Sequence, residues 1–139
     1  MAGYSKTPLV GKLGIKPGYV LHPVNAPADY LDLLEPLPEG VQVVRKLKGE
    51  ADIIHLFSKD RAELERLLPE FQRNIRQAGM IWVSWPKKSA GVPSTITEDV
   101  VREVALPLGL VDTKVCAVDE VWSGLRLVIR VENRKIAKG

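Results

Sequence analysis

The chain has 139 residues, of which 45% are hydrophobic and 27% charged, as expected of one globular domain with a single core. This composition excludes a disordered chain, and no apolar run approaches the roughly 18 residues that a membrane span needs. The net charge of +3 lies at the C-terminal end, because residues 1–129 carry 16 basic and 16 acidic side chains. We therefore predict a single domain over residues 1–131 and a basic, flexible tail over residues 132–139.

The cysteine and histidine content indicates the cellular compartment and whether a metal site is expected. The one cysteine, Cys116, excludes an intramolecular disulfide, and the N-terminus has no apolar run of signal-peptide length. Both features predict a reducing, cytoplasmic compartment. His22 and His55 lie far apart in the sequence, and neither has a second ligand at metal-site spacing, so no metal site is predicted.

The N-terminal half of the chain alternates short helices and strands. Apolar runs bounded by turn residues predict three strands, at residues 19–24, 41–44 and 53–57. The last run is nearly continuous in apolar character, which is typical of a strand covered on both faces. A helical extension is predicted within residues 1–14, ending at Gly14, and a second short helix over residues 30–34.

The longest predicted helix lies in the middle of the chain. It begins at Asp60, with Glu63 three residues later as in a capping box, and helical spacing of apolar residues continues to Ile75. Gly79 is its predicted end, and Pro69 either kinks the helix or divides it. We predict one further helix, at residues 98–105. Three further strands are predicted at residues 80–85, 113–119 and 125–131.

The order of these elements indicates the fold class. Strand, helix, strand, strand, helix, strand, helix, strand, strand is an α/β order that ends in a hairpin. It predicts a three-layer, Rossmann-like sheet, mostly parallel, with right-handed crossovers and a C-terminal antiparallel hairpin. A flavodoxin-like arrangement is the main alternative.

Two resemblances follow from particular stretches. The Pro-Gly turn before the first strand and the closing hairpin on a parallel sheet resemble a class I methyltransferase over residues 15–131. A more specific resemblance is to a family of small bacterial proteins described only as a domain of unknown function. That resemblance is carried by the stretches at residues 52–57, 82–88 and 118–125.

Departures from the methyltransferase pattern lie where those enzymes hold S-adenosylmethionine. Their glycine-rich turn after the first strand is replaced by Asn25-Ala26-Pro27. The acidic residue expected at the end of the second strand is replaced by Arg45 and Lys46. The chain also lacks room for the strand and helix that normally precede residues 52–57. We interpret it as a reduced methyltransferase-like fold with no cofactor in the standard site.

Candidate ligand-binding residues follow from a rule for open parallel sheets, in which ligands bind at the carboxyl ends of the strands. The residues predicted there are Asn25, Phe57, Ser58, Trp85, Lys87, Lys88, Asp119, Glu120, Trp122 and Ser123. The lysines would hold a small polar or anionic ligand, and a tryptophan would give it a flat face. The simpler interpretation is that the lysines are solvated and the tryptophans cover the core. No catalytic residue is predicted, since His55 and Cys116 lie within apolar strands.

Three functions remain. The hypothesis we favour is a non-catalytic protein that binds a partner or another copy of itself. The binding surface would be the rim formed by Trp85 and Trp122, or an edge strand at residues 125–131. The alternative is a small-molecule enzyme or sensor, such as a divergent methyltransferase, that uses the carboxyl edge of the sheet. Nucleic-acid binding ranks last, because basic and aromatic residues are not interleaved along any segment.

Overall fold

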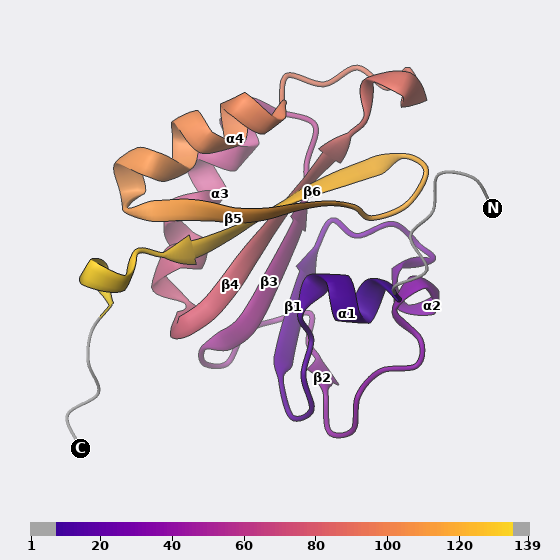
Figure 1. The fold of residues 1–139 in the computed structure, drawn as a ribbon, viewed down its shortest axis with the longest axis vertical. Helices are drawn as coiled ribbons and strands as arrows, with labels where there is room; N and C mark the ends of the chain where they lie inside the picture. The colour runs from indigo at the N-terminus through magenta and orange to yellow at the C-terminus, as the bar shows by residue number, and fades with distance from the viewer. Residues whose placement is uncertain (1–7, 135–139) are drawn as a thin grey trace.

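The computed structural model describes residues 8–134 and shows one six-stranded sheet in the order β2-β1-β3-β4-β6-β5 (Figure 1). The strands are β1 (Val20–Val24), β2 (Gln42–Val43), β3 (Ala51–Phe57), β4 (Ile75–Pro86), β5 (Leu110–Ala117) and β6 (Trp122–Ile129). The first four pair in parallel, whereas β6 runs antiparallel to both of its neighbours, β4 and β5. The predicted mostly parallel α/β sheet with a C-terminal antiparallel hairpin is confirmed, and the flavodoxin-like alternative is wrong because β6 lies between β4 and β5.

Helices cover both faces of the sheet and complete the three layers (Figure 1). The α-helices are α1 (Leu9–Leu13), α2 (Tyr30–Leu34), α3 (Arg61–Arg73) and α4 (Glu98–Ala105). Three short 3-10 turns follow β4, α4 and β6, at η1 (Lys88–Ala90), η2 (Leu106–Leu108) and η3 (Val131–Asn133). The predicted N-terminal helix is thus present as α1. Residues 1–7, and residues 135–139 of the predicted tail, lie outside the described residues.

Two hydrophobic clusters lie on opposite faces of the sheet, because alternate side chains of a strand point to opposite sides. On one face Ile54 and Leu56 of β3 pack with Leu64 and Leu68 of α3 and with the buried side of α4. On the other face α1 and α2 pack against Ile53, Phe57 and Trp82. β3 therefore contributes side chains to both clusters and is buried on both faces, as the sequence predicts.

The long helix differs from its prediction at its C-terminal end. α3 is one helix with Pro69 inside it, and it ends at Arg73 rather than at Gly79. Ile75 already pairs with Ala51 of β3, and the register shifts before Ile53 pairs with Met80. The helical spacing that extends to Ile75 is therefore coincidental, since Ile75 is buried as a strand residue.

The C-terminal strands also differ from expectation. The segment predicted as an edge strand, residues 125–131, belongs largely to β6, which lies between β4 and β5. The edge strand is β5, and the short β2 forms the opposite edge. An interface built on residues 125–131 as an edge strand is therefore excluded, because both sides of β6 are already paired.

The connection between β2 and β3 is short, as the departures from the methyltransferase pattern imply. Residues 44–50 contain no helix or strand. β2 pairs with β1 only at Val20 and Leu21, whereas β1 continues to Val24 beside β3. With about 3.3 Å per residue, β2 ends about 10 Å short of the carboxyl end of β1.

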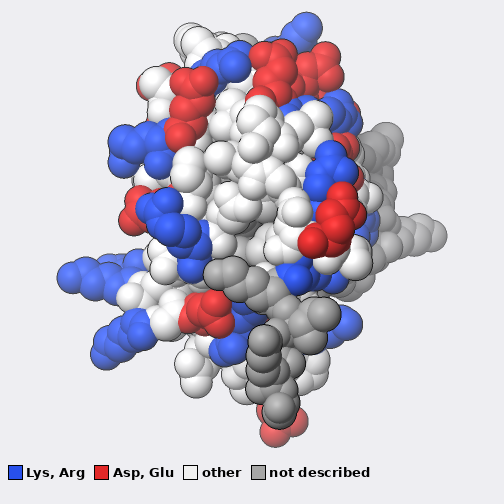
Figure 2. Space-filling model, turned by 90° about the vertical axis from the view of Figure 1, so that its left-hand side faces the viewer, with Lys and Arg blue, Asp and Glu red and all other residues white. Residues whose placement is uncertain are grey.

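Two surface properties bear on the function classes. None of the helices within residues 8–134 has the length and apolar character needed to cross a bilayer. On the face that Figure 2 shows, basic and acidic side chains alternate around an uncharged centre. Binding to a phosphate backbone draws on a continuous basic surface, which this face does not present.

Candidate functional site

A cavity of about 440 Å³ opens at the carboxyl edge of the sheet, where β1 and β3 end. We call it the edge pocket, and it is lined by Asn25, Pro27, Phe57, Ser58, Lys59, Asp60, Glu63 and Trp122. Its position follows from the topology, since the loops after neighbouring parallel strands meet at the same edge. Asn25 turns the chain out of β1 with a φ of 59°, a left-handed conformation that asparagine tolerates better than most residues.

Glu63, in the first turn of α3, is the main charged group of the edge pocket. Its Oε1 accepts a hydrogen bond of 2.5 Å from the Ser58 hydroxyl, and the Asn25 amide lies 3.5 Å from Oε2. An ionised carboxylate has about four acceptor positions, so these contacts orient the group and leave it able to accept further bonds. Glu63 therefore presents a fixed acceptor to a molecule entering the edge pocket.

The floor of the edge pocket is aromatic. The Phe57 ring is buried and meets the half-buried Trp122 edge to face, with ring centroids 5.1 Å apart. On its other side Phe57 stacks on His55 at 4.3 Å and contacts Tyr30 edge to face at 5.4 Å. This stack fixes Phe57, so the half-exposed Trp122 is the aromatic surface that a ligand can reach.

Beneath that floor three buried side chains are linked in a row by hydrogen bonds. The Tyr30 hydroxyl is 2.8 Å from Nδ1 of His55, and Nε2 of His55 is 2.7 Å from the Ser84 hydroxyl. Burial lowers the pKa of His55 from 6.5 to about 3 and raises the pKa of Tyr30, so both groups are neutral at physiological pH. Because all three side chains are buried, they hold the core and offer no accessible base or nucleophile.

Four of the ten predicted site residues meet in the edge pocket: Asn25, Phe57, Ser58 and Trp122. The other six do not line it. Trp85 packs into the cluster on the α3 and α4 face. Lys88 and Glu120 are exposed, in η1 and in the turn before β6, and Ser123 pairs with Trp85 across the β4–β6 ladder.

Lys87 and Asp119 serve the backbone of the β5–β6 turn. The Lys87 ammonium donates a hydrogen bond of 2.7 Å to the Asp119 carbonyl. Oδ1 of Asp119 accepts from the backbone N–H groups of Val121 and Trp122, each at 2.8 Å. These contacts hold Trp122 at the rim of the edge pocket, so both residues affect the pocket only through that turn.

Sequence reasoning missed Glu63, because a glutamate three residues after a cap residue is expected to bond back to the cap. Here the Asp60 backbone N–H lies 3.3 Å from the Ser58 hydroxyl instead, while Oδ1 of Asp60 accepts from Ala62. Ser58 thus takes the place of the glutamate. The sequence did offer one indication. Ser58, between the end of β3 and the Asp60 cap, can bond to the cap residue in place of Glu63, and the Glu63 carboxylate is then free to face the loops.

A sequence-family model and solved structures place the chain among known folds. The model of a family described as a protein of unknown function, DUF3052, matches residues 40–131. The chain belongs to this family. No curated protein matches the sequence.

Several solved structures with a similar fold are methyltransferases. A SAM-dependent methyltransferase from Aquifex aeolicus matches with a TM-score of 0.63 at 15% identity, over 87% of this chain and 88% of that one. A precorrin-6y C5,15-methyltransferase from Geobacter metallireducens gives 0.59 at 11% identity, over 87% and 85%. Magnesium protoporphyrin IX methyltransferase from Synechocystis, solved with bound SAH, gives 0.58 at 11% identity, over 87% and 78%. This DUF3052 chain therefore has the Rossmann-like, class I methyltransferase fold, and identities this low show the fold alone.

Proposed function

We propose that this domain is a non-catalytic binding protein that takes a small ligand in the edge pocket. The observation that carries the proposal is the Glu63 carboxylate, oriented by Ser58 and Asn25 and placed beside Trp122. Ligand sites of this kind combine an apolar wall with a few oriented polar groups. The edge pocket has both.

The chemistry of these groups selects a class of ligand. A carboxylate accepts hydrogen bonds from hydroxyl or ammonium groups, and the exposed part of an indole ring favours a planar ring or a cation. The edge pocket is lined by two carboxylates, Asp60 and Glu63, against one ammonium, Lys59, so of the polar or anionic ligand expected from the sequence the anionic kind is not favoured here. A nucleoside, with its planar base and its ribose hydroxyls, is the simplest molecule that fits both features.

Three observations favour binding over methyl transfer. Pro27 gives the turn after β1 no backbone donor at that position, where the resemblance implies a close approach of glycine backbone to the cofactor. β2 ends level with Leu21, so Arg45 and Lys46 lie well short of the edge pocket. His55 and Ser84, which could otherwise move protons, are buried and bonded to each other.

Calorimetric titration of the full chain tests this proposal, with adenosine, S-adenosylmethionine and S-adenosylhomocysteine as probes. We expect a nucleoside-containing probe to bind and the Glu63→Gln variant to bind it about tenfold more weakly, since a bond to a charged group is worth roughly 1.5–3 kcal/mol. Glu39→Gln is the matched control, because Glu39 is an exposed carboxylate at the opposite edge of the sheet.

Two results would overturn the proposal. One is equal affinity of the wild type and Glu63→Gln for a probe that binds, which would place the ligand elsewhere. The other is methyl transfer from S-adenosylmethionine to an acceptor in a mass-spectrometric assay, which would make the domain a divergent methyltransferase. A wild type that binds none of the probes also contradicts the nucleoside assignment.

A further inference from the structure

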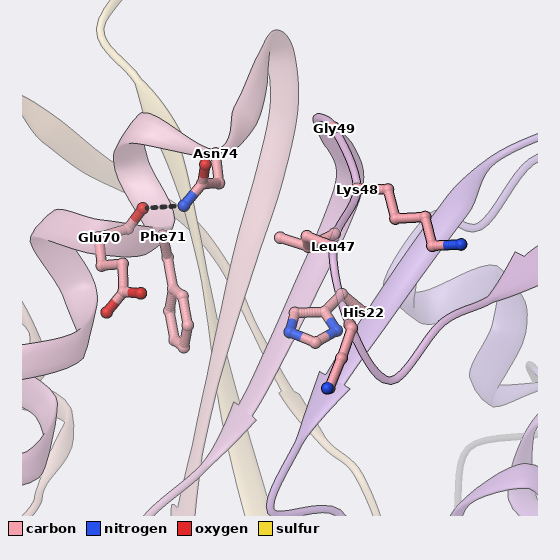
Figure 3. A pocket seen from close by; sticks show the side chains of 8 residues that line it. His22, Leu47, Lys48, Gly49, Glu70, Phe71 and Asn74 are labelled. Carbon is pink, nitrogen blue, oxygen red and sulfur yellow. Dashed lines mark hydrogen bonds between the residues drawn. The ribbon is translucent and has the colours of Figure 1, made fainter.

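A second cavity, of about 580 Å³, lies away from the edge pocket, between β1, the β2–β3 connection and the C-terminal turn of α3 (Figure 3). We call it the loop cavity, and it is lined by His22, Lys46, Leu47, Lys48, Gly49, Glu70, Phe71 and Asn74. His22 and Leu47 stand on one side of it, and Glu70, Phe71 and Asn74 on the other (Figure 3). Its volume is in the range that small-molecule sites occupy.

The loop cavity exists because no helix covers this part of the sheet. α3 packs over β3 and β4, while residues 44–50 return from β2 to β3 without a helix. Leu47 is the apolar residue of that connection that packs against the cluster beneath α3. The space beside it is left to polar side chains, among them His22 on β1.

His22 is held in a defined orientation. Its Nδ1 lies 2.8 Å from the carbonyl oxygen of Val44, which can only accept, so Nδ1 carries the proton and donates. The Val44 N–H donates in turn to the Leu21 carbonyl at 2.9 Å, which fixes the connection to β1. In the neutral ring Nε2 is then an acceptor, and it points across the loop cavity towards α3 (Figure 3). Nε2 has no partner among residues 8–134.

The connection also supplies cations that no described residue neutralises. Neither Lys46 nor Lys48 forms an ion pair or a side-chain hydrogen bond within residues 8–134. The Lys48 side chain extends away from α3 in Figure 3, and its flexible stem allows it to reach the rim. The opposite wall adds acceptors: the Glu70 carboxylate, and the Asn74 amide oxygen, since the Asn74 amide nitrogen donates to the Glu70 carbonyl at 3.0 Å.

We infer that the loop cavity is a binding site for a phosphorylated sugar. The two ammonium groups match the phosphate, which pairs well with lysine. The acceptors on His22, Glu70 and Asn74 match sugar hydroxyls, which a bare inorganic anion lacks. The inference is independent of the edge pocket, because the two cavities share no residue.

The test is a calorimetric titration of the full chain with ribose 5-phosphate, ribose and inorganic phosphate as separate probes. We expect the wild type to bind ribose 5-phosphate more tightly than either fragment. Lys46→Met keeps most of the side-chain volume and should weaken that binding about tenfold, the loss expected for one bond to a charged group. Lys88→Met, in exposed η1 near the other edge of the sheet, is the matched control and should bind as the wild type does.

His22→Asn separates the role of the imidazole from the charge. The asparagine amide can replace Nδ1 as donor to Val44 but has nothing in place of Nε2. We expect this variant to lose affinity for ribose 5-phosphate while its weak affinity for inorganic phosphate is unchanged. Circular dichroism of each variant establishes that it is folded.

Three outcomes overturn the inference. In the first, ribose 5-phosphate does not bind to the wild type at millimolar concentration. In the second, inorganic phosphate binds as tightly as ribose 5-phosphate, which would make the loop cavity an unspecific anion site. In the third, Lys46→Met and folded His22→Asn both bind ribose 5-phosphate as the wild type does.

Discussion

At the scale of single residues, His55 sets the character of the core beside the edge pocket. Its ring accepts or donates at both nitrogens and also stacks on Phe57, so one side chain satisfies Tyr30 and Ser84 and supports the aromatic floor. Burial keeps the ring neutral, because an imidazolium at this position would be a charge in a poorly solvated site. The sequence already places His55 within an apolar strand, which is where a core residue is expected.

The depressed pKa of His55 predicts an acid-sensitive fold. Its pKa is about 3 in the folded chain and near 6.5 in the unfolded chain, so between these values the unfolded chain binds more protons. His55 therefore contributes fully to stability above pH 6.5, and this contribution falls as pH drops through the window, by up to about 1.4 kcal/mol per pH unit. Urea denaturation at a series of pH values from 7 to 4 measures it.

His55→Gln is the comparison for that measurement, because the amide can both donate and accept but does not titrate. We expect the variant to be less stable at pH 7 and to depend less steeply on pH than the wild type. Carboxylates contribute equally to both proteins and cancel in the difference. Identical pH dependence in the two proteins would contradict the assignment of the acid sensitivity to His55.

At the scale of elements, β4 begins with an irregular stretch between Ile75 and Met80. Asp52 of β3 organises it: Oδ2 accepts from the Val20 backbone N–H at 2.8 Å, and Oδ1 pairs with Arg76 at 3.1 Å. Gly79 lies so close to β3 that a Cβ atom there would be 2.7 Å from the Asp52 carbonyl oxygen. This close approach is what the glycine permits.

Gly79→Ala should therefore strain the β3–β4 ladder. A backbone oxygen cannot move aside as a flexible side chain would, so we expect a loss of about 2 kcal/mol in the free energy of unfolding. Gly49→Ala is the matched control, because a Cβ there meets nothing within 4 Å, and it should be nearly neutral. Urea midpoints measure both, and a neutral Gly79→Ala would show that the ladder relaxes freely.

The same stretch shows where sequence reasoning succeeds and where it stops. The order of strands and helices could be predicted, because apolar periodicity reports which side of an element is buried. The boundary at Arg73 could not, since Ile75 continues the helical spacing of α3 although its burial comes from pairing with β3. A pattern of apolar residues does not distinguish these two causes.

The candidate site was predictable to a similar degree. The rule for carboxyl edges predicts that Asn25, Phe57, Ser58 and Trp122 lie together, and the structure places all four around the edge pocket. It misplaced Trp85, because β4 continues to Pro86 and the two-residue alternation turns Trp85 to the α3 and α4 face. The predicted strand already ended at Trp85, so the missing information was which face of the sheet each alternate residue of β4 occupies.

At the scale of the whole molecule, the two faces of the sheet are covered unequally. α3 and α4 span 13 and 8 residues, whereas α1 and α2 span five residues each. Helices this short are not stable alone and depend on their packing. α1 is held partly by the Trp82 indole, which donates a hydrogen bond of 3.0 Å to the Leu13 carbonyl.

We predict that α1 and α2 open before the sheet does. Their amides should exchange with deuterium at least about tenfold faster than those of β3 and β4, because local opening exposes less surface than global unfolding. Hydrogen exchange followed by mass spectrometry measures this under native conditions. Equal protection of α1, α2 and β3 would instead show that the molecule opens as one cooperative unit.

The interior position of β6 has a consequence for synthesis of the chain. β5 leaves the ribosome before β6, yet β6 is the one strand that pairs with it within residues 8–134, and β4 likewise lacks its outer neighbour until residues 122–129 have emerged. During that interval the nascent chain presents two unpaired strand borders, which are the surfaces that associate with other chains. Completion of this sheet therefore waits until residues 122–129 have emerged, and premature termination within β6 would yield an aggregation-prone product.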